Sequence, residues 1–138
     1  MPKYSKASKE RLMSCVPDLI KLFNEVIKGY DCTILCGHRD VNEQFELFKK
    51  GRKEVNGVWV VKDRSQVVTW KDGIKNLSKH NYYPSEAVDA APFPIDWEDI
   101  QRFKGFVEYV RGVADSLDIK IRCGAEWGDY PHFETVEK

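Results

Sequence analysis

The segment EAVDAAPFP, residues 86–94, is the stretch that decides how this sequence is interpreted. It alternates briefly as a β-strand does, and it stops at prolines, which cannot donate to a sheet ladder. Asp89 stands there among small apolar residues, and on a strand its side chain points opposite to Val88 and Ala90, which are free to pack behind it. A nearly buried carboxylate needs a partner, and a metal ion is a suitable one. The segment therefore predicts a core strand that presents a metal ligand.

Two of the three histidines have a carboxylate at a suggestive spacing. Asp89 follows His80, and Asp129 stands shortly before His132. Zinc in a hydrolytic site takes three ligands from His, Asp or Glu and leaves a fourth position for water. His80, Asp89 and His132 would make such a set. Asp129 is then free to act as the general base that takes a proton from the water.

Two helices and a strand are expected in the first part of the chain. Ser8 is expected to cap the first helix, and Pro17 suits the first turn of the second. DCTILCG, residues 31–37, alternates like a strand. The second helix is predicted to end at Gly29, because apolar residues recur at helical spacing up to that point: Leu19, Ile20, Phe23, Val26 and Ile27.

DVNEQFELFKKG, residues 40–51, predicts a third helix. Asp40 is its expected N-cap with an acidic residue three positions on, and Gly51 is its expected terminator. Phe45 and Phe48 are expected to face inward.

Residues 52–79 predict an irregular excursion that carries a hairpin. Asn56-Gly57 and Asp72-Gly73 mark tight turns. The β-prone runs are VWVV at residues 58–61 and VVTW at residues 67–70.

The last third of the chain predicts a core helix and two closing strands. From Asp96 onward, apolar residues recur with the helical period. IKIRCGAEW at residues 119–127 and PHFETV at residues 131–136 then read as strands, with His132 and Glu134 on one face of the second. Together the elements predict an α+β fold, a small and mostly antiparallel sheet with packed helices.

Composition excludes several classes of protein. The 138 residues carry 22 basic and 22 acidic side chains, so no bulk charge favours nucleic acid or an anionic membrane. The length suits one domain, residues 1–138, with one core. No apolar run approaches the roughly 20 residues needed for insertion into a membrane, and no signal-peptide core follows Met1. We therefore expect a single domain that is made and folds in the cytosol.

The four cysteines are expected to be reduced, buried and small hydrophobic side chains. Cys32 and Cys36 would share one strand face, but no second Cys/His pair completes a tetrahedral site there. A structural zinc at these cysteines is therefore disfavoured.

Taken in order, the motifs resemble those of a known family. They are GHR at residues 37–39 with Gln44, GR at 51–52, SKH at 78–80, SEAVDAAP at 85–92 and GAEWGDYPHFE at 124–134. This pattern, over roughly residues 30 to 135, is similar to the zinc peptidases that include phage L-alanyl-D-glutamate endopeptidase endolysins and D-Ala-D-Ala carboxypeptidases and dipeptidases. The resemblance implies a Hedgehog/DD-peptidase-like fold.

The resemblance also implies roles for individual residues. Zinc would bind His80, Asp89 and His132, with Asp129 as the catalytic acid and base. Arg39 would hold or polarise the scissile carbonyl, a role that suits a permanently charged, rigid donor fork. The expected substrate contacts are Ser78, Ser85, Trp127 and Tyr82. Ser85 replaces the glycine of the commonest motif, and NYYP, residues 81–84, lengthens the gap between His80 and Asp89.

Alternatives without a catalytic role remain open for several of these residues. His80 and His132 could be loop histidines, and Asp129 could simply turn the chain. Arg39 could pair with Asp40 at a helix start. Trp127, Tyr82 and Tyr83 could be packed aromatics instead of cleft walls. His38 is expected to pack near the site, and Glu134 is expected either to orient a ligand histidine or to face solvent.

The resemblance implies a zinc-dependent peptidase that hydrolyses the L-Ala-D-Glu amide of the peptidoglycan stem peptide, most simply a phage endolysin. The alternatives are a D-Ala-D-Ala carboxypeptidase or dipeptidase, and a non-catalytic module that binds wall peptide. We expect a monomer that lacks an appended wall-binding module. As an endolysin it would wait in the host cytoplasm until a holin opens the inner membrane, and then act on the periplasmic cell wall.

Overall fold

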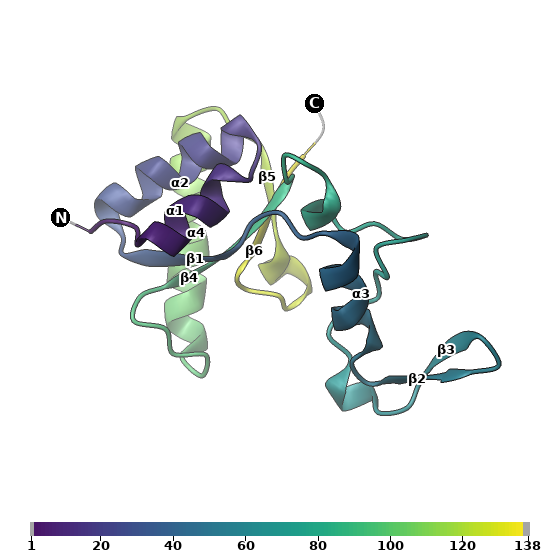
Figure 1. Ribbon diagram of the computed structural model, residues 1–138. Coiled ribbons are helices and arrows are strands. Elements are labelled where there is room, and N and C mark those ends of the chain that lie inside the picture. The colour runs from purple at the N-terminus through teal and green to yellow at the C-terminus, as the bar shows by residue number, and fades with distance from the viewer. Residues whose placement is uncertain (1, 137–138) are drawn as a thin grey trace.

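A four-stranded antiparallel sheet organises the molecule, for which a computed structural model describes residues 2–136. The strands lie in the order β1-β4-β6-β5, and Figure 1 shows them near the middle of the molecule. Their bounds are β1 Cys32–Cys36, β4 Ala87–Pro92, β5 Ile121–Cys123 and β6 His132–Thr135. The predicted α+β class and the central strand around Asp89 are therefore confirmed.

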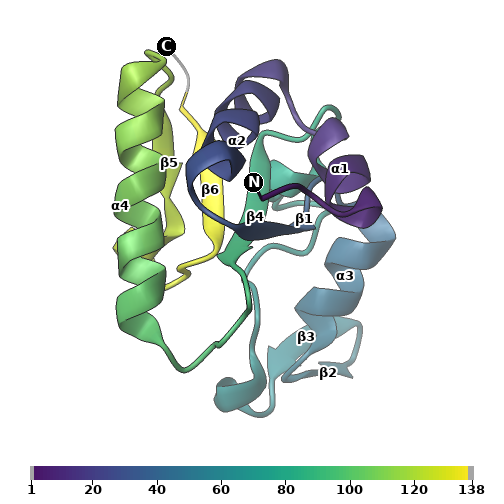
Figure 2. The same ribbon diagram turned by 90° about the vertical axis from the view of Figure 1, so that its left-hand side faces the viewer.

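Helices cover one face of this sheet and close the core. They are α2 Pro17–Gly29 and α4 Ile100–Ser116, whereas α1 Lys6–Met13 bonds through Ser8 and Arg11 to the backbone of Ile34 in the edge strand β1. Figure 2 shows α2 and α4 on the same side of β4 and β6. Phe133 of β6 packs edge-on against Phe23 of α2, with ring centroids 5.4 Å apart. This packing buries one face of β6 and leaves the opposite face to present His132.

The central strand β4 divides its side chains in the predicted way. Val88 and Ala90 are fully buried in the hydrophobic core, whereas Asp89 is only half-buried on the other face. Because successive side chains of a strand point to opposite faces, the packing of Val88 and Ala90 fixes where Asp89 points.

The first helix is capped by a different serine from the predicted one. Ser5 is the N-cap of α1, and its Oγ accepts a hydrogen bond from the backbone N–H of Ser8. Ser8 lies inside the helix, buried, and its Oγ accepts from the backbone N–H of Ile34 at 3.1 Å. The predicted cap at Ser8 is wrong because that hydroxyl binds the strand β1 instead.

The helix α3, Val41–Lys49, begins and ends as predicted. Asp40 and Glu43 form a capping box, and Gly51 follows the helix with a φ of 80°. The prediction that Phe45 and Phe48 face inward is only partly correct. Both side chains are half-buried, and Gln44 is the one fully buried residue of α3. Phe45 instead packs edge-on against Trp59 in the hairpin, with centroids 5.7 Å apart.

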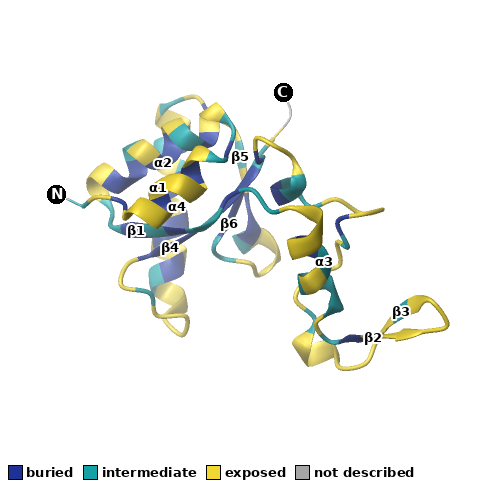
Figure 3. Ribbon diagram, in the orientation of Figure 1, coloured by how far each residue is buried: buried dark blue, intermediate teal, exposed yellow. Residues whose placement is uncertain are grey.

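The excursion forms one hairpin that projects from the main body. β2 Arg52–Val55 pairs with β3 Val58–Val61 across Asn56-Gly57, whose φ angles of 50° and 81° suit a tight two-residue turn. Figure 3 shows that this region is mostly exposed. Gly73 has a φ of 83°, as expected at the second turn.

The run VVTW at residues 67–70 is not a strand. The segment that contains it packs through side chains instead: Arg52 Nη1 donates to the carbonyl of Thr69 at 2.9 Å, and Gln44 Nε2 donates to that of Lys71 at 2.7 Å. The run IKIRCGAEW is likewise strand only in β5. A short 3₁₀-helix, η3 Gly124–Trp127, follows it and ends at Gly128 in the left-handed conformation.

The two cysteines of β1 differ in burial. Cys32 lies in the core 3.5 Å from the Tyr4 hydroxyl. Cys36 is half-buried, and its sulfur lies 3.6 Å from Arg39 Nη2.

Across residues 2–136, none of the helices has the length and apolar character required to cross a bilayer.

Candidate metal centre and active site

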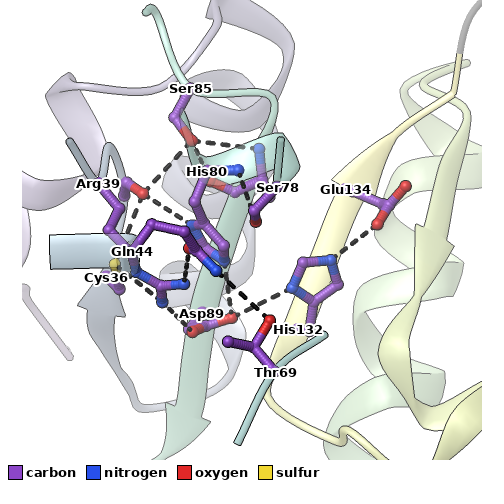
Figure 4. A network of polar contacts seen from close by, with 12 residues as sticks. Cys36, Arg39, Gln44, Thr69, Ser78, His80, Ser85, Asp89, His132 and Glu134 are labelled. Atoms are coloured by element: carbon purple, nitrogen blue, oxygen red, sulfur yellow. Dashed lines mark hydrogen bonds and ion pairs between the residues drawn. The ribbon is translucent and has the colours of Figure 1, made fainter. Parts of the chain in front are cut away.

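Three side chains from separate segments converge on one point. One donor atom each from His80, Asp89 and His132 lies within 4.8 Å of the other two. His80 Nε2 is 3.3 Å from Asp89 Oδ1, and His132 Nδ1 is 3.4 Å from the same oxygen. Figure 4 shows the Asp89 carboxylate between the two imidazoles. The structure thus brings the three predicted ligands together.

Local sequence places each of the two histidines. The short 3₁₀-helix η2, Lys79–Asn81, is capped by Ser78, whose Oγ accepts from the backbone N–H of His80 at 3.3 Å. The His80 carbonyl then accepts from the backbone N–H of Arg39 at 2.8 Å, which ties η2 to the end of β1. His132 needs no such loop, because it lies directly opposite Asp89 in the register of β4 and β6.

The remaining ring nitrogens are fixed by acceptors. His80 Nδ1 is 2.8 Å from the carbonyl of Gly37, and His132 Nε2 is 2.8 Å from Glu134 Oε1. Both partners accept, so each of these nitrogens carries the hydrogen. His80 Nε2 and His132 Nδ1 are then left as lone-pair donors that face Asp89. Of the two expectations for Glu134, its orientation toward a histidine is the one the structure shows.

The three groups form a strongly coupled charge cluster. Burial lowers the pKa of each histidine, but the hydrogen bonds to Asp89 outweigh it and raise the pKa of His80 and of His132 to about 9. For Asp89 burial raises the pKa, yet the hydrogen bonds from His132 and His80 bring it well below its ordinary value. Without a metal, the ionised Asp89 carboxylate therefore favours positive charge on both imidazoles, and a bound cation would supply that charge instead. Two imidazoles and one carboxylate are also the donors that zinc prefers, so the residues fit that metal.

Arg39 lies beside this cluster and is held in place by a buried amide. Arg39 Nη1 donates to Gln44 Oε1 at 2.9 Å, and its Nη2 is 3.7 Å from Asp89 Oδ2. Gln44 is fully buried, and its Nε2 donates to the carbonyl of Lys71. Gln44 therefore links Arg39 to the excursion, a function that the sequence motif alone gave no sign of. Asp40 caps α3, so the alternative of an Arg39–Asp40 pair is not what the structure shows.

Asp129 lies at the wall of the same cleft. Its pKa is raised, first because the carboxyl is partly desolvated and then because the charge of Asp89 is close. Its backbone N–H donates to the Gly124 carbonyl at 2.8 Å, which turns the chain between η3 and β6. A Cβ on Gly124 would lie 2.2 Å from the Asp129 carbonyl oxygen, so this turn requires glycine.

A cleft of about 970 Å³ contains these groups. Ser78, Tyr82 and Trp127 are among the residues that line it, and their contact with substrate stays a prediction. Ser85 does not line it: the residue is fully buried, and its hydroxyl donates to the carbonyl of Ala87 at 2.7 Å. The expected substrate contact at Ser85 is therefore wrong for this structure, because the hydroxyl holds the start of β4.

His38 and Tyr83 lie just outside the cleft. His38 Nδ1 is 3.0 Å from the Tyr82 carbonyl, and its ring packs edge-on against Tyr83 at 5.1 Å. Neither residue is among those that line the cavity. His38 thus packs near the site, as expected, while Tyr83 is not a wall of it.

Comparison with known proteins identifies the family of this chain. The model of the family described as phage L-alanyl-D-glutamate peptidase matches residues 1–138. The L-alanyl-D-glutamate peptidase of Escherichia phage T5 is 30% identical over an alignment length of 136, and the match covers 93% of this chain and 85% of that protein. The crystal structure of an L-Ala D-Glu endopeptidase of Serratia marcescens matches with a TM-score of 0.68 at 22% identity, covering 97% of this chain and 90% of that one, and this likeness concerns the fold. The chain belongs to the phage L-alanyl-D-glutamate peptidase family.

Proposed function

We propose that this chain is a zinc-dependent endopeptidase that hydrolyses the L-alanyl-D-glutamate amide of the peptidoglycan stem peptide. The observation that carries the proposal is the convergence of His80, Asp89 and His132, flanked by Arg39 and Asp129, in one cleft. Family membership supports the choice of this bond over the terminal D-Ala-D-Ala bond.

His80, Asp89 and His132 would hold the zinc ion. Bound zinc polarises a carbonyl oxygen and lowers the pKa of water to roughly 7. The Gly37 carbonyl and Glu134 keep the two imidazoles in the tautomers that leave His80 Nε2 and His132 Nδ1 free to bind it.

Asp129 is the proposed acid and base. Its carboxylate takes a proton from the attacking water and delivers it to the amine that leaves with the D-glutamate residue. Its raised pKa suits this exchange, since a carboxyl with a pKa nearer neutrality both accepts and returns a proton more readily.

Arg39 is the proposed electrophilic group. Its guanidinium lines the cleft, where it donates hydrogen bonds to the scissile carbonyl as negative charge develops there. Gln44 holds one edge of the guanidinium through Nη1, so the side chain is already oriented before substrate binds.

Digestion of purified peptidoglycan, with the new termini identified by mass spectrometry, tests the proposal. New N-terminal D-glutamate is expected with the wild type and is expected to be absent with Asp129→Ala. Release of terminal D-alanine alone would show a carboxypeptidase instead. Equal binding without cleavage by both proteins would show a module that only binds the wall. As a phage endolysin, the protein is proposed to be produced in the host cytoplasm and to act on the periplasmic wall.

A further inference from the structure

Four lysine and arginine side chains line the cleft, and they differ in whether another side chain bonds to them. Arg39 is bonded to Gln44, and Lys79 Nζ is 3.4 Å from Glu86 Oε1. Within residues 2–136, the side chains of Lys71 and Arg122 form no ion pair. Among the described residues, these two are therefore the lysine and arginine side chains of the cleft outside any salt bridge, although the charge of Arg122 is close enough to help lower the pKa of Glu134.

Arg122 is the one of the two that adjoins the metal ligands. It lies on β5 directly opposite Glu134 of β6, so both side chains share the sheet face that also presents His132. Its guanidinium carbon is 4.7 Å from the centre of the Trp127 ring, a cation–π contact. The same ring lies 5.7 Å from that of His132. Trp127 thus holds Arg122 at the edge of the catalytic group.

The proposed substrate brings a negative charge to this place. A glutamate residue has two carboxyl groups, and only one of them continues the peptide, so the other stays free. That free carboxylate lies a few covalent bonds from the scissile nitrogen. Asp89, Asp129 and Glu134 line the cleft. The proposed zinc ion would offset the charge of Asp89, whereas Asp129 and Glu134 oppose a further carboxylate unless a cation receives it. A guanidinium suits the task better than an ammonium because its parallel N–H groups match a carboxylate.

We propose that Arg122, held against the Trp127 ring, binds the free carboxylate of the glutamate residue on the leaving side of the scissile bond. This inference rests on the proposed function. It adds the residue that makes the cleft selective for substrates with a free carboxylate on the residue after the scissile bond. Arg122 is a binding residue in this assignment, and Trp127 is a positioning residue that orients it.

The test uses the zinc-loaded full chain and two synthetic peptides. They differ only after the scissile bond, where one has D-glutamate with its free carboxylate and the other has the same residue with that carboxylate amidated. For the wild type, kcat/KM is expected to be roughly 10- to 100-fold higher for the acidic peptide. Arg122→Gln is expected to bring this ratio close to one, Arg122→Lys to restore part of it, and the matched variant Lys71→Gln to keep it.

A second measurement does not need turnover. In the Asp129→Ala background, titration calorimetry is expected to show tighter binding of the acidic peptide, and loss of that preference when Arg122→Gln is added. Wild-type cleavage of both peptides at equal rates, or a ratio that survives in Arg122→Gln, would overturn the inference. If the preference for the acidic peptide is lost only in Lys71→Gln, Lys71 and not Arg122 binds the carboxylate, and the inference is wrong. If the wild type cleaves neither peptide, the proposed function fails, and equal affinities in the calorimetry then refute the role of Arg122 separately.

Discussion

Asp89 and His132 face each other directly across β4 and β6, with His132 Nδ1 3.4 Å from Asp89 Oδ1. This cross-strand pair supplies two of the three candidate ligands from rigid strands whose opposite faces are packed in the core. His80 is the third, and it comes from a short 3₁₀-helix tied to the sheet by its carbonyl and its Nδ1. The centre is therefore supported mostly by regular structure, which favours a fixed geometry.

Removal of one ligand is expected to abolish metal binding. His80→Ala leaves one imidazole and one carboxylate, too few for a stable zinc site. Elemental analysis is expected to find about one zinc per wild-type chain and almost none in the variant. The matched control His38→Ala is expected to keep its zinc, because the His38 ring bonds to the Tyr82 carbonyl outside the cleft. Equal zinc content in wild type and His80→Ala would refute the ligand assignment.

Glu134→Gln is expected to weaken zinc binding by roughly 10- to 100-fold without unfolding the protein. The carboxylate accepts the hydrogen of His132 Nε2, and the amide can present its nitrogen instead, which disturbs the tautomer that leaves Nδ1 free. Competition with a chelator measures the affinity. Glu126→Gln, at an exposed position of η3, is the control and is expected to change nothing. An unaltered affinity in Glu134→Gln would count against its orienting role.

The stability of the metal-free protein is expected to fall in alkaline solution. Folding raises the pKa of His80 and His132 from 6.5 to about 9, chiefly because their hydrogen bonds to Asp89 outweigh the effect of burial. A group with a raised pKa binds protons on folding, so its contribution is complete below pH 6.5 and disappears as the pH rises through about 9. The lowered pKa of Asp89 acts at the other end, where stability declines as acid protonates the carboxylate.

Thermal melts of the chelated protein at about pH 6 and about pH 10 check this expectation. Tm is expected to be lower at the higher pH, and the difference is expected to be much smaller in a His80→Ala/His132→Ala double variant. With zinc bound the drop is expected to shrink, because metal competes with protons and is favoured at higher pH. A metal-free Tm that does not change over this interval would contradict the coupling.

Gly124→Ala is expected to damage the turn that carries Asp129. The added Cβ would meet the Asp129 carbonyl oxygen at 2.2 Å and His132 Cβ at 2.7 Å, so backbone must move. We expect a loss of about 1–3 kcal/mol in the free energy of unfolding and roughly tenfold lower kcat/KM. Gly112→Ala in α4 is the matched control, since no atom lies within 4 Å of its added Cβ. It is expected to stabilise the helix by about 0.5–1 kcal/mol. Similar behaviour of the two variants would refute the steric argument.

Patterns among residues close together in the sequence predicted most of the helices and strands. The capping box of Asp40, the Asn56-Gly57 hairpin and the alternation around Asp89 each depend on neighbours in the sequence, and the structure shows all three. Ser8 and VVTW at residues 67–70 were wrong because long-range partners, Ile34 and Arg52, engage them. A pattern among neighbouring residues carries no information about partners so far away in the sequence.

The sequence by itself named the candidate ligands, because the order of its motifs resembles that of a known peptidase family, whereas residue types and spacing alone left loop histidines as an alternative. Only the tertiary structure decided which side chains share the cleft. It buried Ser85 just before β4, made Gln44 the support of Arg39, and brought Arg122 of β5 against Trp127. The physical reason is that ligand chemistry is a property of single residues, whereas a contact depends on strand register and on packing between segments far apart in the chain.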